Sequence, residues 1–183
     1  MRTFLSLVAL WLGSLAASAP RDENPAGGPV RLEIALDMTE YPFRGAIALT
    51  VTYTNVSKGA VVLWANGSPT GEGFPGETFE ITSGAGRKTY TIVAIEPKVD
   101  KVAIEPGKSW KRTIKDLAPA LSNTGIVIDD KVQRSTDPLP DPFGRLDEYT
   151  IRMSFQSAVK NQAEPAFNGK VESNLQKFKV RLR

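Results

Sequence analysis

The chain of 183 residues contains no histidine and no cysteine. Without these residues it cannot build a Ser-His-Asp or Cys-His catalytic arrangement, a disulfide, or the histidine-zinc centre of an HExxH peptidase. Paired carboxylates are the catalytic groups that remain available. The composition therefore favours a protein that binds over one that reacts, and we expect no enzyme activity, no cofactor and no metal site.

The chain also lacks an apolar run long enough to cross a membrane. Arg2 precedes an apolar run over residues 4–15, and Ala17-Ser18-Ala19 has the small-x-small form of a signal peptidase site. The run is roughly a dozen residues long, whereas a membrane helix needs about 20. Residues 1–19 are thus predicted to be a signal peptide cleaved near Ser18 or Ala19, which places the mature protein in the periplasm or outside the cell. Residues 20–29, rich in Pro and Gly, are predicted to be a disordered leader.

A strong excess of charge of either sign is missing too. Without Arg2, 22 basic residues stand against 20 acidic ones, a net charge of +2. Such a balance gives no electrostatic footprint for nucleic acid. We therefore expect neither a nucleic-acid partner nor an integral membrane span.

Alternating apolar and polar residues dominate the chain after Pro29, which is the pattern of strands with one buried face. Val30, Leu32, Ile34, Leu36 and Met38 share one such face. The predicted strands cover residues 30–38, 47–53, 61–64, 78–82, 89–96, 102–105, 109–115, 126–133, 149–156 and 177–183. No convincing helical period follows the signal. The pattern predicts an all-β fold, an immunoglobulin-like antiparallel β-sandwich of about eight to ten strands.

Residues 30–183 are predicted to form this single domain, with a Pro- and Asp-rich loop near residues 135–148. Residues 41–45 are predicted to be a turn. Residues 61–64 are apolar on both faces, which predicts a central strand covered on each side.

Three stretches carry a resemblance: residues 49–57, which end in Thr-Asn-Val-Ser; residues 79–81 followed by Tyr90; and residues 104–110, which contain Pro-Gly-Lys-Ser-Trp. They resemble the immunoglobulin-like domains of BsuPI-type intracellular proteinase inhibitors and the N-terminal segments of deuterolysin-type metallopeptidases, over residues 30–117. The resemblance implies a binding or inhibitory module and carries over no site residue. After Leu117 the chain departs from that pattern and continues for nearly 60 residues.

Candidate ligand-binding residues lie in a long loop and in one strand. Trp64 and Phe74 flank a Gly-rich loop in which Asn66 and Glu72 offer hydrogen bonds to a sugar or peptide stacked on the rings. Trp110 lies in a strand whose face, shared with Arg112 and Ile114, is only partly apolar. The alternative is that the rings close the end of the core, and it is stronger for Trp64 because Val62 shares its face.

Three carboxylate pairs are candidates for acid-base chemistry: Glu77 with Glu80, Asp129 with Asp130, and Asp147 with Glu148. Neighbouring residues of a strand face opposite ways, so solvated strand-end charges are the favoured interpretation. Asp137, Asp141 and Asp147 offer oxygen ligands for calcium. The spacing lacks the D-x-D-x-D-G run of a calcium loop, and the intervening prolines favour a rigid surface loop instead.

Four cations alternate with apolar residues at the C-terminus: Lys177, Lys179, Arg181 and Arg183. They suit an anionic polysaccharide, lipid head groups or an acidic partner, or they protect an exposed sheet edge from aggregation, which is the commoner use. Taken together, the sequence predicts an exported, non-catalytic β-sandwich that binds a macromolecule, with a protein as the favoured partner and an inhibitor-like role implied by the resemblance. The alternative is a carbohydrate-binding module of the cell envelope or extracellular matrix.

Overall fold

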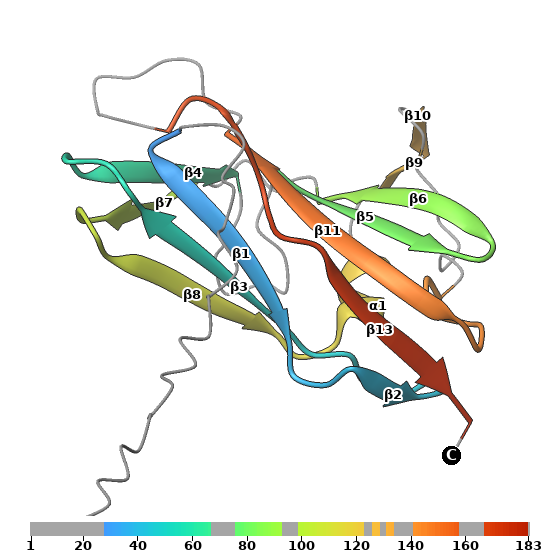
Figure 1. Ribbon diagram of the computed structural model, residues 1–183. Helices are drawn as coiled ribbons and strands as arrows, with labels where there is room; N and C mark the ends of the chain where they lie inside the picture. Colours follow the sequence, from blue (N-terminus) through green and yellow to red (C-terminus); the bar gives the residue numbers. More distant parts are fainter. Residues whose placement is uncertain are drawn as a thin grey trace, which may run out of the picture.

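The computed structural model describes residues 28–66, 76–92, 99–122, 126–128, 131–133, 141–157 and 167–182. These residues form strands with one short helix, so the prediction of an all-β fold is confirmed (Figure 1). The strands are β1 (Val30–Leu36), β2 (Glu40–Pro42), β3 (Leu49–Asn55), β4 (Val61–Asn66), β5 (Glu77–Ser83), β6 (Gly86–Thr91), β7 (Val99–Ile104), β8 (Ser109–Ile114), β9 (Ile126–Ile128), β10 (Lys131–Gln133), β11 (Glu148–Gln156), β12 (Lys170–Glu172) and β13 (Gln176–Arg181), and the helix is α1 (Leu117–Ser122).

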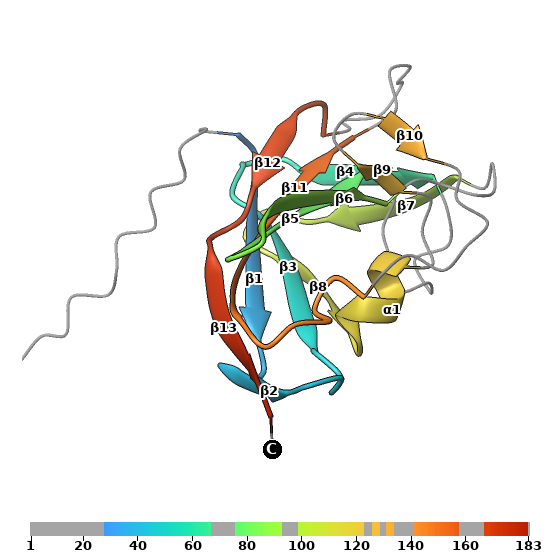
Figure 2. The same ribbon diagram turned by 90° about the vertical axis from the view of Figure 1, so that its right-hand side faces the viewer.

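Two sheets enclose the core. One has the order β1-β3-β8, and the other has the order β2-β13-β11-β5-β6 with β12 also paired to β11. Both contribute to a single cluster of buried apolar side chains, which makes the fold a sandwich (Figure 2). The pairs β4-β7 and β9-β10 form two further small sheets, and β9 lies against β6. Among the described strands the pairing is antiparallel except between β2 and β13, which are parallel.

The alternation predicted from the sequence holds through the main strands. Leu49, Val51 and Tyr53 of β3 are fully buried, and the predicted inward residues of β11 are buried as well. The predicted inward faces fail at two strand ends. Met38 is 45% exposed because β1 ends at Leu36, and Leu182 is 70% exposed because β13 ends at Arg181.

Short elements account for the main differences from the sequence prediction. The predicted turn at residues 41–45 begins inside β2, and the predicted strand over 126–133 is a pair of short strands, β9 and β10. Helix α1 was missed because its six residues make one apolar contact face, of Leu117, Ala120 and Leu121, too short to establish a period. Strand β12 has only one inward residue, Val171, and shows no alternation either.

Strand β13 is not an exposed edge, so the interpretation of its cations as edge protection is wrong. Its residues 176–179 pair with β11 and its residues 179–181 pair with β2, as Figure 1 shows near the C-terminus. Lys179 forms an ion pair with Glu148 at 2.6 Å, while Lys177 and Arg181 are exposed. Arg183 lies outside the described residues.

The first three residues of β4 are buried on both faces of the strand, but the strand is not central among the described ones. Val61, Val62 and Leu63 are all buried, as predicted. Among the described strands, however, β4 pairs with β7 alone, and at its other edge Phe167 N donates to Val62 O at 2.9 Å. The prediction that residues 61–63 are buried on both faces is therefore confirmed, whereas the predicted central position of the strand is wrong for the described strands.

Asn55 organises one corner of the sandwich. It is fully buried, its Nδ2 donates to Gly59 O (2.8 Å) and Ile104 O (2.7 Å), and its Oδ1 accepts from the backbone and hydroxyl of Ser57. Its main-chain O accepts from the N of Gly107, whose φ of +70° suits glycine. The Thr-Asn-Val-Ser and Pro-Gly stretches thus meet in one structure because a single amide ties their backbones together.

Candidate functional site

A buried charged cluster joins the two sheets. Glu77 of β5 is fully buried, and its Oε1 accepts from Tyr53 Oη (2.7 Å, β3) and Arg112 Nε (3.1 Å, β8), while Arg112 Nη2 pairs with its Oε2. Burial, followed by the Glu77 charge, raises the pKa of Tyr53 well above its ordinary value. Trp110 and Ile114 share the inward face of β8 with Arg112. The charged residue that made this face only partly apolar in the sequence is the partner of Glu77 in a buried ion pair.

The candidate carboxylate pairs do not converge on a cleft. Glu80 lies on the opposite face of β5 from Glu77 and pairs with Arg87 at 3.5 Å. Asp147 Oδ2 accepts from Gly84 N at 2.9 Å, whereas Glu148 is held by Lys179, which lowers the pKa of its carboxyl. Asp129 and Asp130 lie outside the described residues.

The described acidic residues of the calcium hypothesis, Asp141 and Asp147, do not form a set of ligands. Asp141 Oδ1 accepts from Phe143 N at 2.8 Å, within its own turn, and Asp147 is engaged as above. Asp137 lies outside the described residues. Within the described ranges no group of three acidic side chains is placed to hold a metal ion.

The predicted ligand-binding residues fall mostly outside the described part of the chain. Glu72 and Phe74 belong to the loop that is not described, and Trp64 and Asn66 lie in β4 with side chains that are not described. Trp110 is half-buried, and its ring lies 5.5 Å from that of Tyr53, centroid to centroid. The ring of Trp110 therefore belongs in part to the core.

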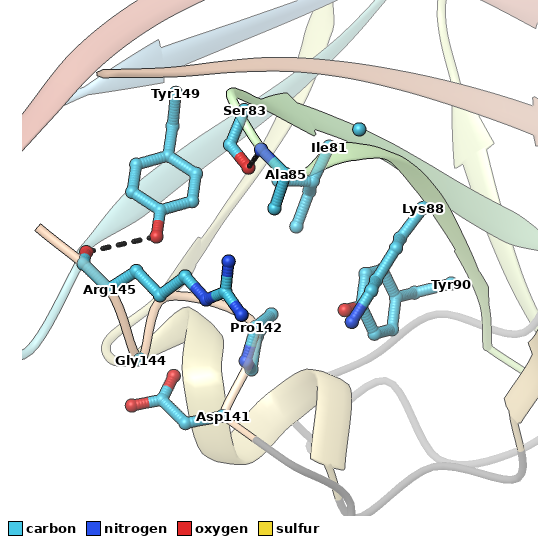
Figure 3. A pocket seen from close by; sticks show the side chains of 11 residues that line it. Ile81, Ser83, Ala85, Lys88, Tyr90, Asp141, Pro142, Gly144, Arg145 and Tyr149 are labelled. Atoms are coloured by element: carbon cyan, nitrogen blue, oxygen red, sulfur yellow. Dashed lines mark hydrogen bonds between the residues drawn. The ribbon is translucent and has the colours of Figure 1, made fainter. Parts of the chain in front are cut away.

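A cavity of about 310 Å³ opens beside the β5-β6 hairpin. Toward the turn of the hairpin, the lining of the cavity passes from the buried Ile81 and Tyr90 to Ser83, Ala85 and Lys88. The segment that leads into β11 forms the opposite wall. Ile81, Lys88 and Tyr90 line the cavity on the hairpin side, and Asp141, Arg145 and Tyr149 line it on the other side (Figure 3).

Local contacts hold the two walls in place. The Asp147 carboxylate anchors the hairpin turn through Gly84 N. On the other wall, Phe143 is buried, with its ring 5.4 Å from that of Tyr149 and 5.5 Å from that of Phe178. Gly144 N donates to Asp141 O at 3.2 Å and closes the turn. Because Phe143 is fixed in the core, Arg145 two residues later is presented at the cavity.

Two cations face each other across the cavity. Figure 3 shows the side chains of Lys88 and Arg145 reaching toward the same space from opposite walls. Neither forms a salt bridge with any residue in the described ranges, and both are exposed. The nearby carboxylate of Asp141 is turned toward its own loop, where it accepts from Phe143 N. The cavity thus combines two free cations with one engaged carboxylate.

The two phenols of the cavity stay neutral at physiological pH. Burial, followed by the charge of Asp141, raises the pKa of Tyr90, and burial is also the largest cause of the raised pKa of Tyr149. Tyr149 Oη donates to Arg145 O at 3.0 Å, which fixes the backbone beneath the guanidinium. With Ile81, these rings give the cavity an apolar floor.

Sequence reasoning missed this cavity, although one signal was present. Lys88 lies on the same strand face as the buried Tyr90 and Ile92, so the alternation places a cation on a face that is otherwise apolar. Arg145 carried no signal, because its place opposite Lys88 depends on how a loop folds back on a hairpin 57 residues earlier in the chain.

Fold and cavity together define an all-β sandwich with a cationic cavity beside one hairpin. No family model matches the chain, and no curated protein matches it. Among solved structures, it is similar to the crystal structure of Spo0M, sporulation control protein, from Bacillus subtilis, with 12% sequence identity and a TM-score of 0.39. The match covers 85% of this chain and 51% of that one, so this chain spans about half the length of Spo0M. A similarity of this size assigns no function. Within the described residues, no helix is long and apolar enough to span a bilayer.

Proposed function

We propose that this chain is an exported, non-catalytic β-sandwich module that binds a protein partner at the cavity between the β5-β6 hairpin and residues 141–149. The observation that carries the proposal is the pair of cations, Lys88 and Arg145, that face one space with no ion-pair partner among the described residues. Two like charges that line one cavity favour an anionic partner. The signal-like residues 1–19 support export.

The size and the lining of the cavity favour a protein over a polysaccharide. About 310 Å³ is at the lower limit of small-molecule sites and accommodates a single projecting side chain with its neighbours. The carbohydrate alternative depends on Trp64, Asn66, Glu72 and Phe74, of whose side chains nothing is described, and on Trp110, which packs against Tyr53. The case for a protein partner therefore rests on the charged cavity and not on these aromatic residues.

A capture experiment tests the proposal. The purified protein is immobilised and exposed to envelope and culture-medium extracts of the source cells, beside a variant with Lys88→Glu and Arg145→Glu. The matched control is Arg87→Glu, which reverses a neighbouring charge on the opposite face of β6. We expect the wild-type protein and the control to retain the same proteins and the double variant to lose them.

Two results would contradict protein binding. One is the absence of any retained protein, and the other is retention of polysaccharide in its place. Addition of the purified protein to the proteinase activity of the same extracts tests the inhibitor-like role, which predicts a decrease in activity. N-terminal sequencing of the protein from the extracellular or periplasmic fraction tests export, with a start just after Ser18 or Ala19 expected.

A further inference from the structure

The geometry points to a specific ligand for this cavity: the carboxylate of an aspartate or glutamate side chain in the partner, held between Lys88 and Arg145. This inference rests on the proposed function and names the group that the cavity recognises. The two cations come from different elements, β6 and the segment before β11, and they meet at one space (Figure 3). Neither is neutralised within the described part of the chain.

The two cations offer complementary contacts to a carboxylate. The planar guanidinium of Arg145 presents paired N–H donors that match the two oxygens, and the Lys88 ammonium acts as a compact charge on the other side. Both side chains are exposed, so water solvates the two charges as long as the cavity holds no ligand. The backbone beneath Arg145 is fixed by Tyr149 Oη, which reduces the freedom that binding must remove.

Asp141 limits the negative charge that the cavity accepts. With Lys88 and Arg145 it leaves the cavity a net charge of about +1, which a single carboxylate neutralises. A phosphate monoester carries about −1.5 to −2 at neutral pH and would face the Asp141 carboxylate as well. The cavity is thus suited to a carboxylate rather than to a phosphorylated residue.

The floor of the cavity suits the stem of an acidic side chain. Ile81, Tyr90 and Tyr149 are buried residues that line the same cavity as the two cations. Their phenols are neutral, because burial raises the pKa of each, so they add no negative charge where the carboxylate would lie. The methylenes of glutamate or aspartate would pack on this floor while the carboxylate reaches the cations.

The test is an NMR titration of the purified protein with short blocked peptides that differ at one central residue: glutamate, glutamine or phosphoserine. An oligogalacturonate is a fourth probe, since it carries carboxylates on a sugar chain. We expect the glutamate peptide to shift the resonances of Lys88, Tyr90 and Arg145, and the other three to bind at least about tenfold more weakly, the size of one lost charged hydrogen bond. Added salt should weaken the glutamate peptide.

Matched variants assign the effect to the cavity. Lys88→Gln and Arg145→Gln should each weaken the glutamate peptide about tenfold or more, whereas Arg87→Gln, which removes the same charge from the other face of β6, should change it less than about twofold. Asp141→Asn keeps an oxygen acceptor for Phe143 N and should strengthen the phosphoserine peptide. Folding of every variant is checked by its amide spectrum.

The inference is overturned if glutamate and glutamine peptides bind equally, if the phosphoserine peptide or the oligogalacturonate binds more tightly than the glutamate peptide, or if Arg87→Gln acts like Lys88→Gln. Its failure is distinguishable from failure of the proposed function. Capture of a protein partner with no peptide response at the cavity would support protein binding and contradict carboxylate recognition. A peptide response with no captured protein would support carboxylate recognition and contradict the proposed function.

Discussion

Replacement of Arg112 by methionine is expected to lower the free energy of unfolding by about 3–5 kcal/mol, the usual cost of leaving a buried charge without its partner. Glu77 is 0% exposed at its side chain and Arg112 only 10%. The change removes both donations from the guanidinium and leaves Tyr53 Oη among the donors to the carboxylate. Methionine fills much of the volume of the arginine stem, so cavity formation adds little.

The assay is urea unfolding followed by circular dichroism, together with thermal unfolding. For a domain of this size about 1 kcal/mol corresponds to about 2–4 °C, so the melting temperature should fall by about 6–20 °C. The double variant Glu77→Leu with Arg112→Met removes both charges and should recover most of the loss, because an apolar pair can replace a buried ion pair at little cost. Arg87→Ala breaks an exposed pair with Glu80 and should cost no more than about 1 kcal/mol.

The reasoning is refuted if Arg112→Met costs less than Arg87→Ala, or if the double variant is as unstable as the sum of its single changes. In either case the carboxylate of Glu77 would find solvation that its full burial does not indicate. A loss confined to the thermal transition, with no change in urea midpoint, would likewise contradict an electrostatic cost in the folded state.

Three further predictions concern the fold. Asn55→Ala should lower the free energy of unfolding by about 1–3 kcal/mol in urea, because it removes the buried hydrogen bonds that the Asn55 amide donates to Gly59 O and Ile104 O. Gly76→Ala should cost at least about 1–3 kcal/mol in the same assay, since φ is +96° there and a Cβ would lie 2.4 Å from Gln156 O. The pKa of each of the four tyrosines is raised by burial, so the folded protein should show less tyrosinate absorbance at pH 10 than the protein in urea, which should titrate near that value. Because these pKa values are higher in the folded state than in the unfolded one, stability is full below about pH 10 and falls above it; equal titration curves for folded and unfolded protein would contradict this.

The fold class and most of the main strands could be predicted because alternation is a local property. A residue in an extended segment points to the same side as the residue two positions away, so the apolar faces of β1, β3 and β11 can be identified without knowledge of their partners. The same logic explains the failures. Strand ends such as Met38 depend on where pairing stops, and short elements such as β12 and α1 contain too few residues to display a period.

The candidate site could not be predicted in the same way. Lys88 and Arg145 lie far apart in the chain, and they meet because Phe143 inserts into the core and Asp147 holds the hairpin turn. The pairing of Glu77 with Arg112 is similar: each residue reads as a surface charge in its own strand. Only the packing of one sheet on the other shows that both point inward.

The amino-acid sequence alone thus determined the all-β character, the faces of the long strands and the exclusion of histidine and cysteine chemistry, because residue type and spacing of two act within one segment. Tertiary structure decided the strand order, the cover on β13, the burial of Glu77 with Arg112, and the cationic cavity. Each of these depends on contacts between segments distant in sequence, which no local pattern encodes.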